Sequence, residues 1–334
     1  MRNKNNRKLI ALITLIIGII ATGYTIGSYF TDYALKRGND TDPLAPPAAC
    51  ISIHDKSREV PALPKASMEK WSAVSADGRH LAATRYSPQN PGKRWVILVH
   101  GYGRDQRYVR DYVGAYLEKG YQVLTPDLCA SGESEGSYIT MGVKESGEVV
   151  LWAAKIKEYD PDSEIVLHGV SMGAATVLMA AGREDISGLV AVIEDCGYTS
   201  AYAMFSNQLG VIFGLPEFPI MACIDVVSGI KTGAKVSDAA PLKAAPHIKV
   251  PVLFIHGAAD TLVPPAMMEK LFAACRTKKK KLVVEGAGHG DAMITDRENY
   301  WKCIFDFLQD SYTADRLAKG QALQSGDCIG TLKR

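Results

Sequence analysis

The sequence predicts an α/β protein: a mostly parallel, doubly wound sheet with a helical insertion that forms a cap. Two observations support this class. Residues 95–99 and 189–193 are short, continuous apolar runs, as expected for strands buried on both faces. Helical stretches separate such runs, and strands that alternate with helices form parallel sheets. The chain of 334 residues is long enough for one such domain with extensions at its ends.

The expected elements follow one another with short connections. The body begins with a hairpin, because residues 71–75 and 80–86 flank an Asp-Gly turn at 76–79. Further strands are expected at 95–99, 121–125, 164–167, 189–193, 250–255 and 281–284, and helices at 108–119, 143–159, 174–181, 265–275 and 297–310. The stretch from about 197 to 245 breaks this rhythm and is expected to fold as the cap.

The cap stretch is rich in apolar, aromatic and methionine side chains. Flexible methionines and aromatic rings suit a pocket for an acyl or aryl group. The same residues would also serve to pack the cap onto the body. The sequence is therefore compatible both with a substrate pocket in the cap and with side chains that only pack the cap onto the body.

The N-terminus has the pattern of a membrane anchor. Four basic residues within the first eight precede residues 9–26, an apolar stretch without charge. Its length is close to the 17–25 residues that span a bilayer, and the basic flank favours an inside N-terminus. A cleaved signal peptide, and hence a secreted protein, is the alternative, but residues 21–23 give no clean cleavage site. We expect an uncleaved signal anchor with the catalytic domain outside the cytoplasm.

The domain organisation follows from these signals. Residues 1–30 are expected to form the transmembrane anchor, and 31–65 a linker rich in proline and turn formers. The folded body is expected over 66–310, followed by a C-terminal tail over 311–334.

Charge and cysteine content indicate which ligands and cross-links to expect. A formal net charge of +2 argues against a nucleic-acid binder, which usually has a concentrated basic surface. The seven cysteines form no CxxC pair and no metal-ligand spacing. A disulfide that involves Cys50 or Cys328 stays open for a domain outside the cytoplasm.

The segment Gly169-Val170-Ser171-Met172-Gly173 carries the main chemical signal. This G-x-S-x-G pattern lies between a predicted strand and a predicted helix, the context of a nucleophile elbow. An unassisted serine hydroxyl is a poor nucleophile, so Ser171 needs a base, and the base needs an orienting acid.

The partners of Ser171 are expected downstream, in the order acid and then histidine. Asp260 follows the strand at 250–255, and His289 follows the last strand. We therefore predict a catalytic triad of Ser171 as nucleophile, His289 as general acid and base, and Asp260 as the group that orients the imidazole. Asp195, at the end of the preceding strand, is the main rival to Asp260. Asp127 is expected to bond to backbone in its own loop.

An acyl-transfer serine also needs donors for the oxyanion. The elbow supplies the backbone N–H of Met172. The loop after the strand at 95–99 reads His100-Gly101-Tyr102-Gly103, and the N–H of Tyr102 is the predicted second donor.

These motifs together resemble the α/β-hydrolase superfamily, and within it a membrane-anchored group of serine aminopeptidase-like or esterase-like hydrolases. The resemblance covers about residues 71–309 and rests on segments 100–103, 127–136, 169–173, 194–200, 257–260 and 288–289. Relatives usually carry arginine and glycine where this chain has Cys129 and Ala130. The resemblance implies no metal and no organic cofactor, and the sequence has neither an H-x-x-H pair nor a dinucleotide fingerprint.

Three functions follow as hypotheses. The leading one is a serine esterase that cleaves a small-molecule acyl ester through an acyl-enzyme. The second is a serine aminopeptidase, which would need a carboxylate in the cap, such as Glu217 or Asp225, to hold the substrate ammonium. The third is a non-catalytic hydrolase-fold module that binds a partner at the cell surface.

Overall fold

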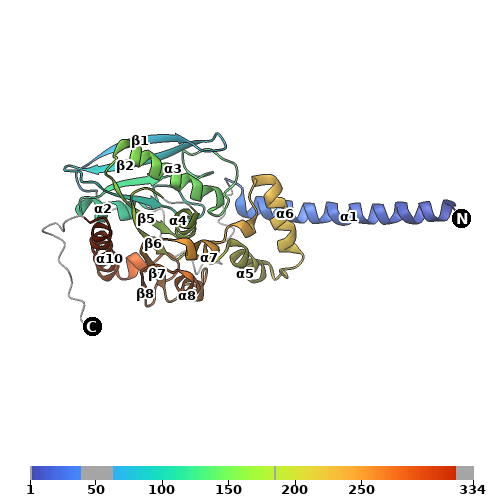
Figure 1. Cartoon of the computed structure of the whole chain (residues 1–334). Coiled ribbons are helices and arrows are strands. Elements are labelled where there is room, and N and C mark those ends of the chain that lie inside the picture. Colours follow the sequence, from blue (N-terminus) through green and yellow to red (C-terminus); the bar gives the residue numbers. More distant parts are fainter. Residues whose placement is uncertain (1, 39–62, 184–185, 321–334) are drawn as a thin grey trace.

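The computed structural model describes residues 2–38, 63–183 and 186–320, and within them the chain forms one eight-stranded sheet (Figure 1). Its order is β1-β2-β4-β3-β5-β6-β7-β8. The strands are β1 (Ala66–Val74), β2 (His80–Pro88), β3 (Arg94–Val99), β4 (Gln122–Pro126), β5 (Glu164–Val170), β6 (Leu189–Asp195), β7 (Val252–Gly257) and β8 (Lys279–Val284). The β1–β2 and β2–β4 pairs are antiparallel and all others are parallel, which confirms the predicted fold class.

Helices cover both faces of the sheet. One face carries α3 (Val143–Tyr159), α4 (Met172–Arg183) and α8 (Pro265–Ala274), and the other carries α2 (Arg110–Glu118), α9 (Ala292–Thr295) and α10 (Arg297–Ala318). Strand β3 shows how the two cores arise. Trp95 and Ile97 point into one core and Val96 and Leu98 into the other, because successive side chains of a strand alternate between faces.

The final helix is longer than the sequence predicted. Helix α10 continues past residue 310 to Ala318, and Tyr312 is buried in the second core. The first eight residues of the predicted tail are therefore the end of a packed helix. The predicted tail beyond them, from 321, lies outside the described residues.

The insertion between β6 and β7 is helical, as predicted for the cap. It contains α5 (Ala201–Phe213), α6 (Ile220–Thr232), η1 (Val236–Asp238), α7 (Pro241–Ala244) and η2 (Ala245–His247). Ser200 caps α5 by accepting a hydrogen bond from the Ala203 N–H, a typical helix start. Gly214 ends α5 with φ 63°, the left-handed conformation that glycine adopts readily.

Helix α1 (Arg2–Leu35) projects from the body beside the cap (Figure 1). Within the part of the chain that the structure describes, it is the helix long and apolar enough to cross a membrane, with a mean hydropathy of 2.3 in its most apolar window. A signal sequence would pass the same test. The helix includes residues 31–35, which the sequence assigned to the linker, while 39–62 of that linker lie outside the described residues.

The last turns of α1 pack against the cap, a contact that the sequence did not predict. Gly27 lies so close to α6 that a Cβ atom there would stand 2.4 Å from the Cys223 carbonyl oxygen. The Lys231 ammonium pairs with the Asp32 carboxylate at 2.7 Å. The Phe30 and Phe213 rings meet edge to face, with centroids 5.3 Å apart. Part of the predicted anchor is thus part of the folded body.

Cys50 and Cys328, for which the sequence left a disulfide open, lie outside the described residues. The cysteines that the structure describes, Cys129, Cys196, Cys223, Cys275 and Cys303, are free thiols.

Candidate active site

Ser171 lies in a sharp turn between β5 and α4. Its φ is 58°, a conformation that non-glycine residues rarely adopt and that is typical of strained functional turns. The flanking glycines are required by close approach. A Cβ at Gly169 would stand 2.1 Å from the Gly173 carbonyl oxygen, and one at Gly173 would stand 2.1 Å from the Val99 carbonyl oxygen. The elbow therefore sits directly against the end of β3.

The structure brings the three predicted triad residues together. The distance between Ser171 Oγ and His289 Nε2 is 2.7 Å, and that between His289 Nδ1 and Asp260 Oδ2 is also 2.7 Å. These distances fit the tautomer in which the serine hydroxyl donates to Nε2 and Nδ1–H donates to the carboxylate. The Asp260 side chain is fully buried and the His289 side chain is 15% exposed. The hydrogen-bonded chain of side chains therefore extends from the buried Asp260 to the partly exposed Ser171.

Asp260 is held as an anion by four donors. Its Oδ1 accepts hydrogen bonds from the N–H groups of Leu262 and Val263, at 3.0 and 2.8 Å. Its Oδ2 faces His289 and also His256 Nε2, which is 3.3 Å away. Burial alone would favour the neutral acid, but the hydrogen bonds from His256, His289 and the backbone lower the pKa of Asp260 to about 2.

His256 also belongs to this site, although the sequence motifs gave it no part in the triad. Its Nε2 lies 2.8 Å from the Val263 carbonyl oxygen as well as close to Asp260. Burial lowers its pKa, but the neighbouring Asp260 and Glu194 carboxyl groups more than offset this, so that the pKa of His256 is raised. The sequence signal that could have indicated this contact is the position of His256 at the end of β7, four residues before Asp260.

The rival carboxylates have other partners. Asp195 Oδ2 accepts a hydrogen bond from the Tyr300 hydroxyl at 2.7 Å. Asp127 accepts from the Gln106 backbone at 2.7 Å and from the Glu133 backbone at 2.9 Å, which matches the predicted loop-bonding role. Of the three aspartates, Asp260 is the one that contacts His289.

The predicted oxyanion loop lies against the elbow. A Cβ at Gly101 would stand 3.3 Å from Ser171 Cβ. His100 holds this loop by donating from Nδ1 to the Gly101 carbonyl at 2.8 Å and accepting from the Leu128 N–H at 3.0 Å. Tyr102 hydrogen-bonds through its hydroxyl to the Ala34 carbonyl of α1. Met172, the other predicted donor, is the first residue of α4.

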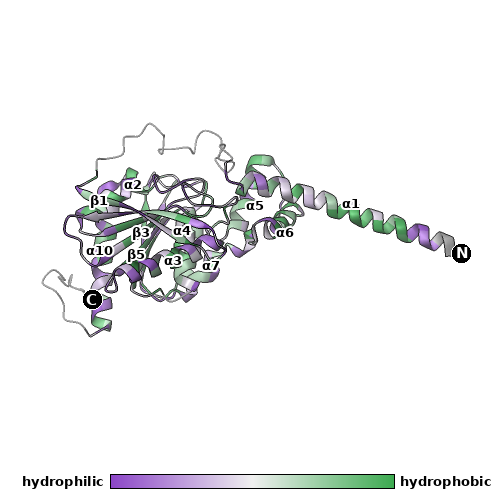
Figure 2. Ribbon diagram, turned by 90° about the horizontal axis from the view of Figure 1, so that it is seen from above, coloured by the Kyte–Doolittle hydropathy of each residue, from purple (hydrophilic) through white to green (hydrophobic). Residues whose placement is uncertain are grey.

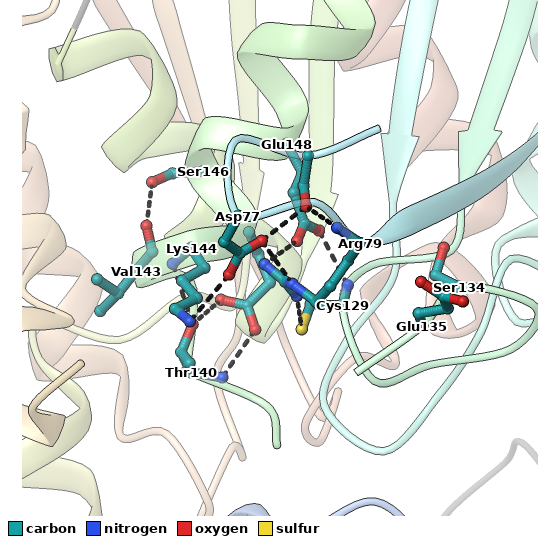
Figure 3. Close-up of polar contacts among 12 residues, drawn as sticks. Asp77, Arg79, Cys129, Ser134, Glu135, Thr140, Val143, Lys144, Ser146 and Glu148 are labelled. Carbon is teal, nitrogen blue, oxygen red and sulfur yellow. Dashed lines mark hydrogen bonds and ion pairs between the residues drawn. The ribbon is translucent and has the colours of Figure 1, made fainter. Parts of the chain in front are cut away.

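A polar cluster underlies the neighbouring loop, which contains Cys129 and Ala130 (Figure 3). Arg79, from the turn between β1 and β2, contacts Cys129 Sγ and lies 3.3 Å from the Glu148 carboxylate. Burial raises the pKa of the Cys129 thiol to about 12, so the sulfur stays protonated at neutral pH. Ala130 adopts φ 58°, a conformation that non-glycine residues rarely adopt. The guanidinium beside Glu148 thus comes from a distant turn, which no local pattern predicted.

One group of possible metal ligands occurs among the described residues. Ligand atoms of Cys196, Asp260 and His289 lie within 4.8 Å of one another. Two of these residues already bond to each other in the candidate triad, and burial raises the pKa of the Cys196 thiol well above its usual range. A metal would require the thiolate, so this donor set fits a neutral thiol packed beneath the triad better than a metal centre.

The cap carboxylates that a peptidase would require are engaged with the cap itself. Glu217 accepts a hydrogen bond from Ser206 Oγ at 2.6 Å. Asp225 accepts from the Ser237 N–H at 2.7 Å and from its hydroxyl at 2.9 Å. Asp225 therefore ties α6 to η1.

An elbow serine at the carboxyl edge of this sheet, under a helical cap, defines a serine hydrolase of the α/β-hydrolase superfamily. The comparison with family models is more specific. Residues 115–314 match the prolyl oligopeptidase family, and the chain belongs to this family.

Similar sequences occur in bacteria and yeast. YqkD of Bacillus subtilis is 26% identical over 246 residues, which are 73% of this chain and 80% of that protein. The membrane protein YNL320W of Saccharomyces cerevisiae is 25% identical over 243 residues, which cover 72% of this chain and 79% of the yeast protein.

Solved structures share the fold. The esterase Pf2001 of Pyrococcus furiosus superposes with a TM-score of 0.61 at 21% identity, over 74% of this chain and 92% of the esterase. The acylaminoacyl peptidase of Pyrococcus horikoshii gives a TM-score of 0.59 at 16% identity, over 75% of this chain and 42% of the peptidase. At these identities the likeness establishes the fold alone.

Proposed function

We propose that this serine hydrolase cleaves carboxylic esters through an acyl-enzyme, with Ser171, His289 and Asp260 as its catalytic triad. The observation that carries the proposal is the pair of 2.7 Å contacts that link the three side chains. Hydrogen-bond reach between nucleophile and base, and between base and acid, is the geometry that this chemistry needs.

Acylation begins at the serine. Ser171 Oγ attacks the ester carbonyl carbon while its proton passes to His289 Nε2, and the carbonyl oxygen becomes an oxyanion. The N–H groups of Met172 and Tyr102 would stabilise this charge, and losing one such donor typically costs about 2.7–4 kcal/mol. The imidazolium then protonates the leaving alkoxide, which departs as an alcohol. Asp260, anionic at neutral pH, stabilises the imidazolium.

Deacylation repeats the sequence with water. His289 Nε2 takes a proton from a water molecule that attacks the acyl carbon. The second oxyanion collapses, the carboxylic acid leaves and the proton on His289 returns to Ser171 Oγ. No electron transfer and no further reactant are required.

The cap favours the ester over the peptide. An aminopeptidase needs a carboxylate that is available to the substrate ammonium, and Glu217 and Asp225 already accept hydrogen bonds from the cap's own serines. The serine aminopeptidase is therefore the second candidate.

The triad is tested by active-site labelling of the full chain. A fluorophosphonate probe should label the wild type and fail to label Ser171→Ala. Equal labelling of both proteins would refute Ser171 as nucleophile, and no labelling of either would favour the non-catalytic binding module.

The substrate class is tested on the same preparations. We expect hydrolysis of p-nitrophenyl esters of increasing acyl length, and turnover of aminoacyl anilides that is at least tenfold slower. Faster cleavage of the anilides, abolished in Ser171→Ala, would favour the peptidase.

We also propose that α1 anchors the chain in a membrane with the catalytic domain outside the cytoplasm. Support comes from the length and hydropathy of α1, the basic residues before it and the yeast relative described as a membrane protein. Protease treatment of sealed spheroplasts should digest the body. Protection of the body in intact spheroplasts, with digestion after lysis, would reverse the topology, and release of the chain without α1 would identify a secreted protein.

A further inference from the structure

The part of α1 in which every residue is exposed is too short to cross a bilayer alone. Residues 9–22 are uncharged and exposed, and a helix of that length rises about 21 Å. The hydrocarbon core of a bilayer is roughly 30 Å thick. A span that starts at Leu9 must therefore continue to about Ser28. The flanks agree, because Lys8 precedes this segment and Tyr29 follows it, and basic and aromatic residues are typical of the two interfaces.

The last two turns of this span are already packed against the cap. A Cβ at Gly23 would lie 3.4 Å from Cys223 Sγ, and one at Gly27 would lie 2.6 Å from Val227 Cγ2. Small residues four positions apart form the usual contact surface of helices packed within membranes. Both views show α6 beside α1 where α1 leaves the body (Figures 1 and 2).

The contacts between α1 and α6 determine how deep α6 would lie in the membrane. Gly23 and Gly27 meet Cys223 and Val227, whereas Asp32, beyond the apolar span, pairs with Lys231 at 2.7 Å. The contacts therefore advance in the same order along both helices. The first half of α6 lies level with the last turns of the membrane span, and its charged end lies at the water interface.

The outer face of α6 is apolar at this depth. Ala222, Val226 and Ile230 are four residues apart, so they share one face of the helix, and all three are exposed. Phe218, just before α6, is 79% exposed. We name these four residues the cap stripe. An exposed row of large apolar side chains beside a membrane helix indicates a further contact surface.

Burial of the stripe must accommodate the charged groups of the same hairpin. Glu217 accepts a hydrogen bond from Ser206, Asp225 accepts two from Ser237, and Lys231 pairs with Asp32. Each charge has a protein partner, which lowers the cost of placing it near hydrocarbon.

We propose that the cap stripe enters the bilayer, with Phe218, Ala222 and Val226 in the hydrocarbon region and Ile230 at its boundary, so that the α5–α6 hairpin is a second membrane-inserted element beside α1. The proposal takes α1 as a membrane span, as proposed above, and is independent of the reaction at Ser171. Its partner is the acyl-chain region of a phospholipid bilayer. The cap of the candidate active site would then sit at the membrane surface.

The test uses tryptophan as a depth probe in the full chain, reconstituted into phosphatidylcholine vesicles with or without brominated acyl chains. The native tryptophans, Trp71, Trp95, Trp152 and Trp301, are buried in the body. Val226→Trp probes the stripe, and Met68→Trp on β1 is the matched control, since these positions are 57% and 59% exposed. Ile16→Trp reports insertion of α1, and Ile230→Trp reports the shallower end of the stripe.

We expect brominated lipid to quench Val226→Trp and Ile16→Trp at least twofold more than Met68→Trp, with Ile230→Trp in between. Circular dichroism checks that each variant is folded. Quenching of Ile16→Trp with Val226→Trp equal to the β1 control would overturn the proposal, because α1 would then insert alone. If brominated lipid does not quench Ile16→Trp, α1 is not inserted and the proposal fails. This outcome does not depend on which substrate the enzyme hydrolyses. A blue-shifted but unquenched Val226→Trp in a dimeric species would assign the stripe to a second copy of the chain, which also overturns the proposal.

Discussion

Two buried aspartates at the ends of neighbouring parallel strands have opposite protonation tendencies. Asp195 is the last residue of β6, and Asp260 lies three residues beyond β7. Burial raises the pKa of both, and it dominates for Asp195, whose pKa rises to about 6. The hydrogen bonds to Asp260 outweigh burial and lower its pKa to about 2.

The number of donors explains this difference. Asp195 Oδ2 accepts one hydrogen bond from Tyr300, and Oδ1 has no hydrogen-bond partner among the described residues. Asp260 faces two imidazoles and accepts two backbone N–H groups. A place at the carboxyl edge of the sheet is therefore not enough to keep a buried aspartate ionised. The loop after β7 supplies the donors that keep it ionised, and the end of β6 does not.

The largest expected effect is a difference in kcat between the variants of the two aspartates. Asp260→Asn should lower kcat for ester hydrolysis at neutral pH by about 10⁴-fold, because an amide favours the wrong imidazole tautomer. Asp195→Asn should change kcat less than tenfold. Steady-state kinetics on both variants, with fold checked by circular dichroism, measures the contrast. Equal losses in the two variants would mean that Asp260 is not the triad acid.

A smaller effect is expected on stability at the end of β6. Tyr300→Phe removes the hydrogen bond to Asp195 and should lower the unfolding free energy by about 1–3 kcal/mol. Tyr112→Phe is the matched control, since this nearby buried hydroxyl makes no hydrogen bond among the described residues. Denaturant unfolding followed by tryptophan fluorescence compares them. A larger loss for Tyr112→Phe would refute this account of Asp195.

The last expected effect is a pH dependence next to Asp195. Burial raises the pKa of Glu194 to about 8, above its usual value of 4.5. The folded chain thus keeps a proton that the unfolded chain loses, so this contribution to stability is present below about pH 4.5 and is lost as pH rises through 8. Glu194→Gln cannot ionise and should lose less stability between pH 5 and pH 8.5.

The measurement is the unfolding free energy of wild type and Glu194→Gln at both pH values. Asp260 has the opposite sign, since its lowered pKa contributes stability above pH 3.8 that is lost as pH falls through about 2. Identical pH slopes for the two proteins would show that Glu194 does not keep its proton in the folded state.

Periodicity and local signals were enough to locate most elements and to propose the candidate triad. Helix α3 occupies the predicted residues 143–159, because an apolar face, a glycine before it and an Asp-Pro stop lie within one segment. The candidate triad followed from position, since each residue comes directly after a buried strand. Missed features were contacts between distant segments: Arg79 with Cys129, His256 with Asp260, and α1 with the cap.

The chain by itself determined where its strands and helices form, where the elbow turns and which serine, aspartate and histidine follow strand ends. These are consequences of local hydrophobic patterns and backbone preferences, which short segments already contain. Only the tertiary structure decided the strand order, the hydrogen bonds that distinguish Asp260 from Asp195 and the packing of α1 on α6. Those depend on the donors, charges and surfaces that distant segments bring to one place, and no local pattern encodes them.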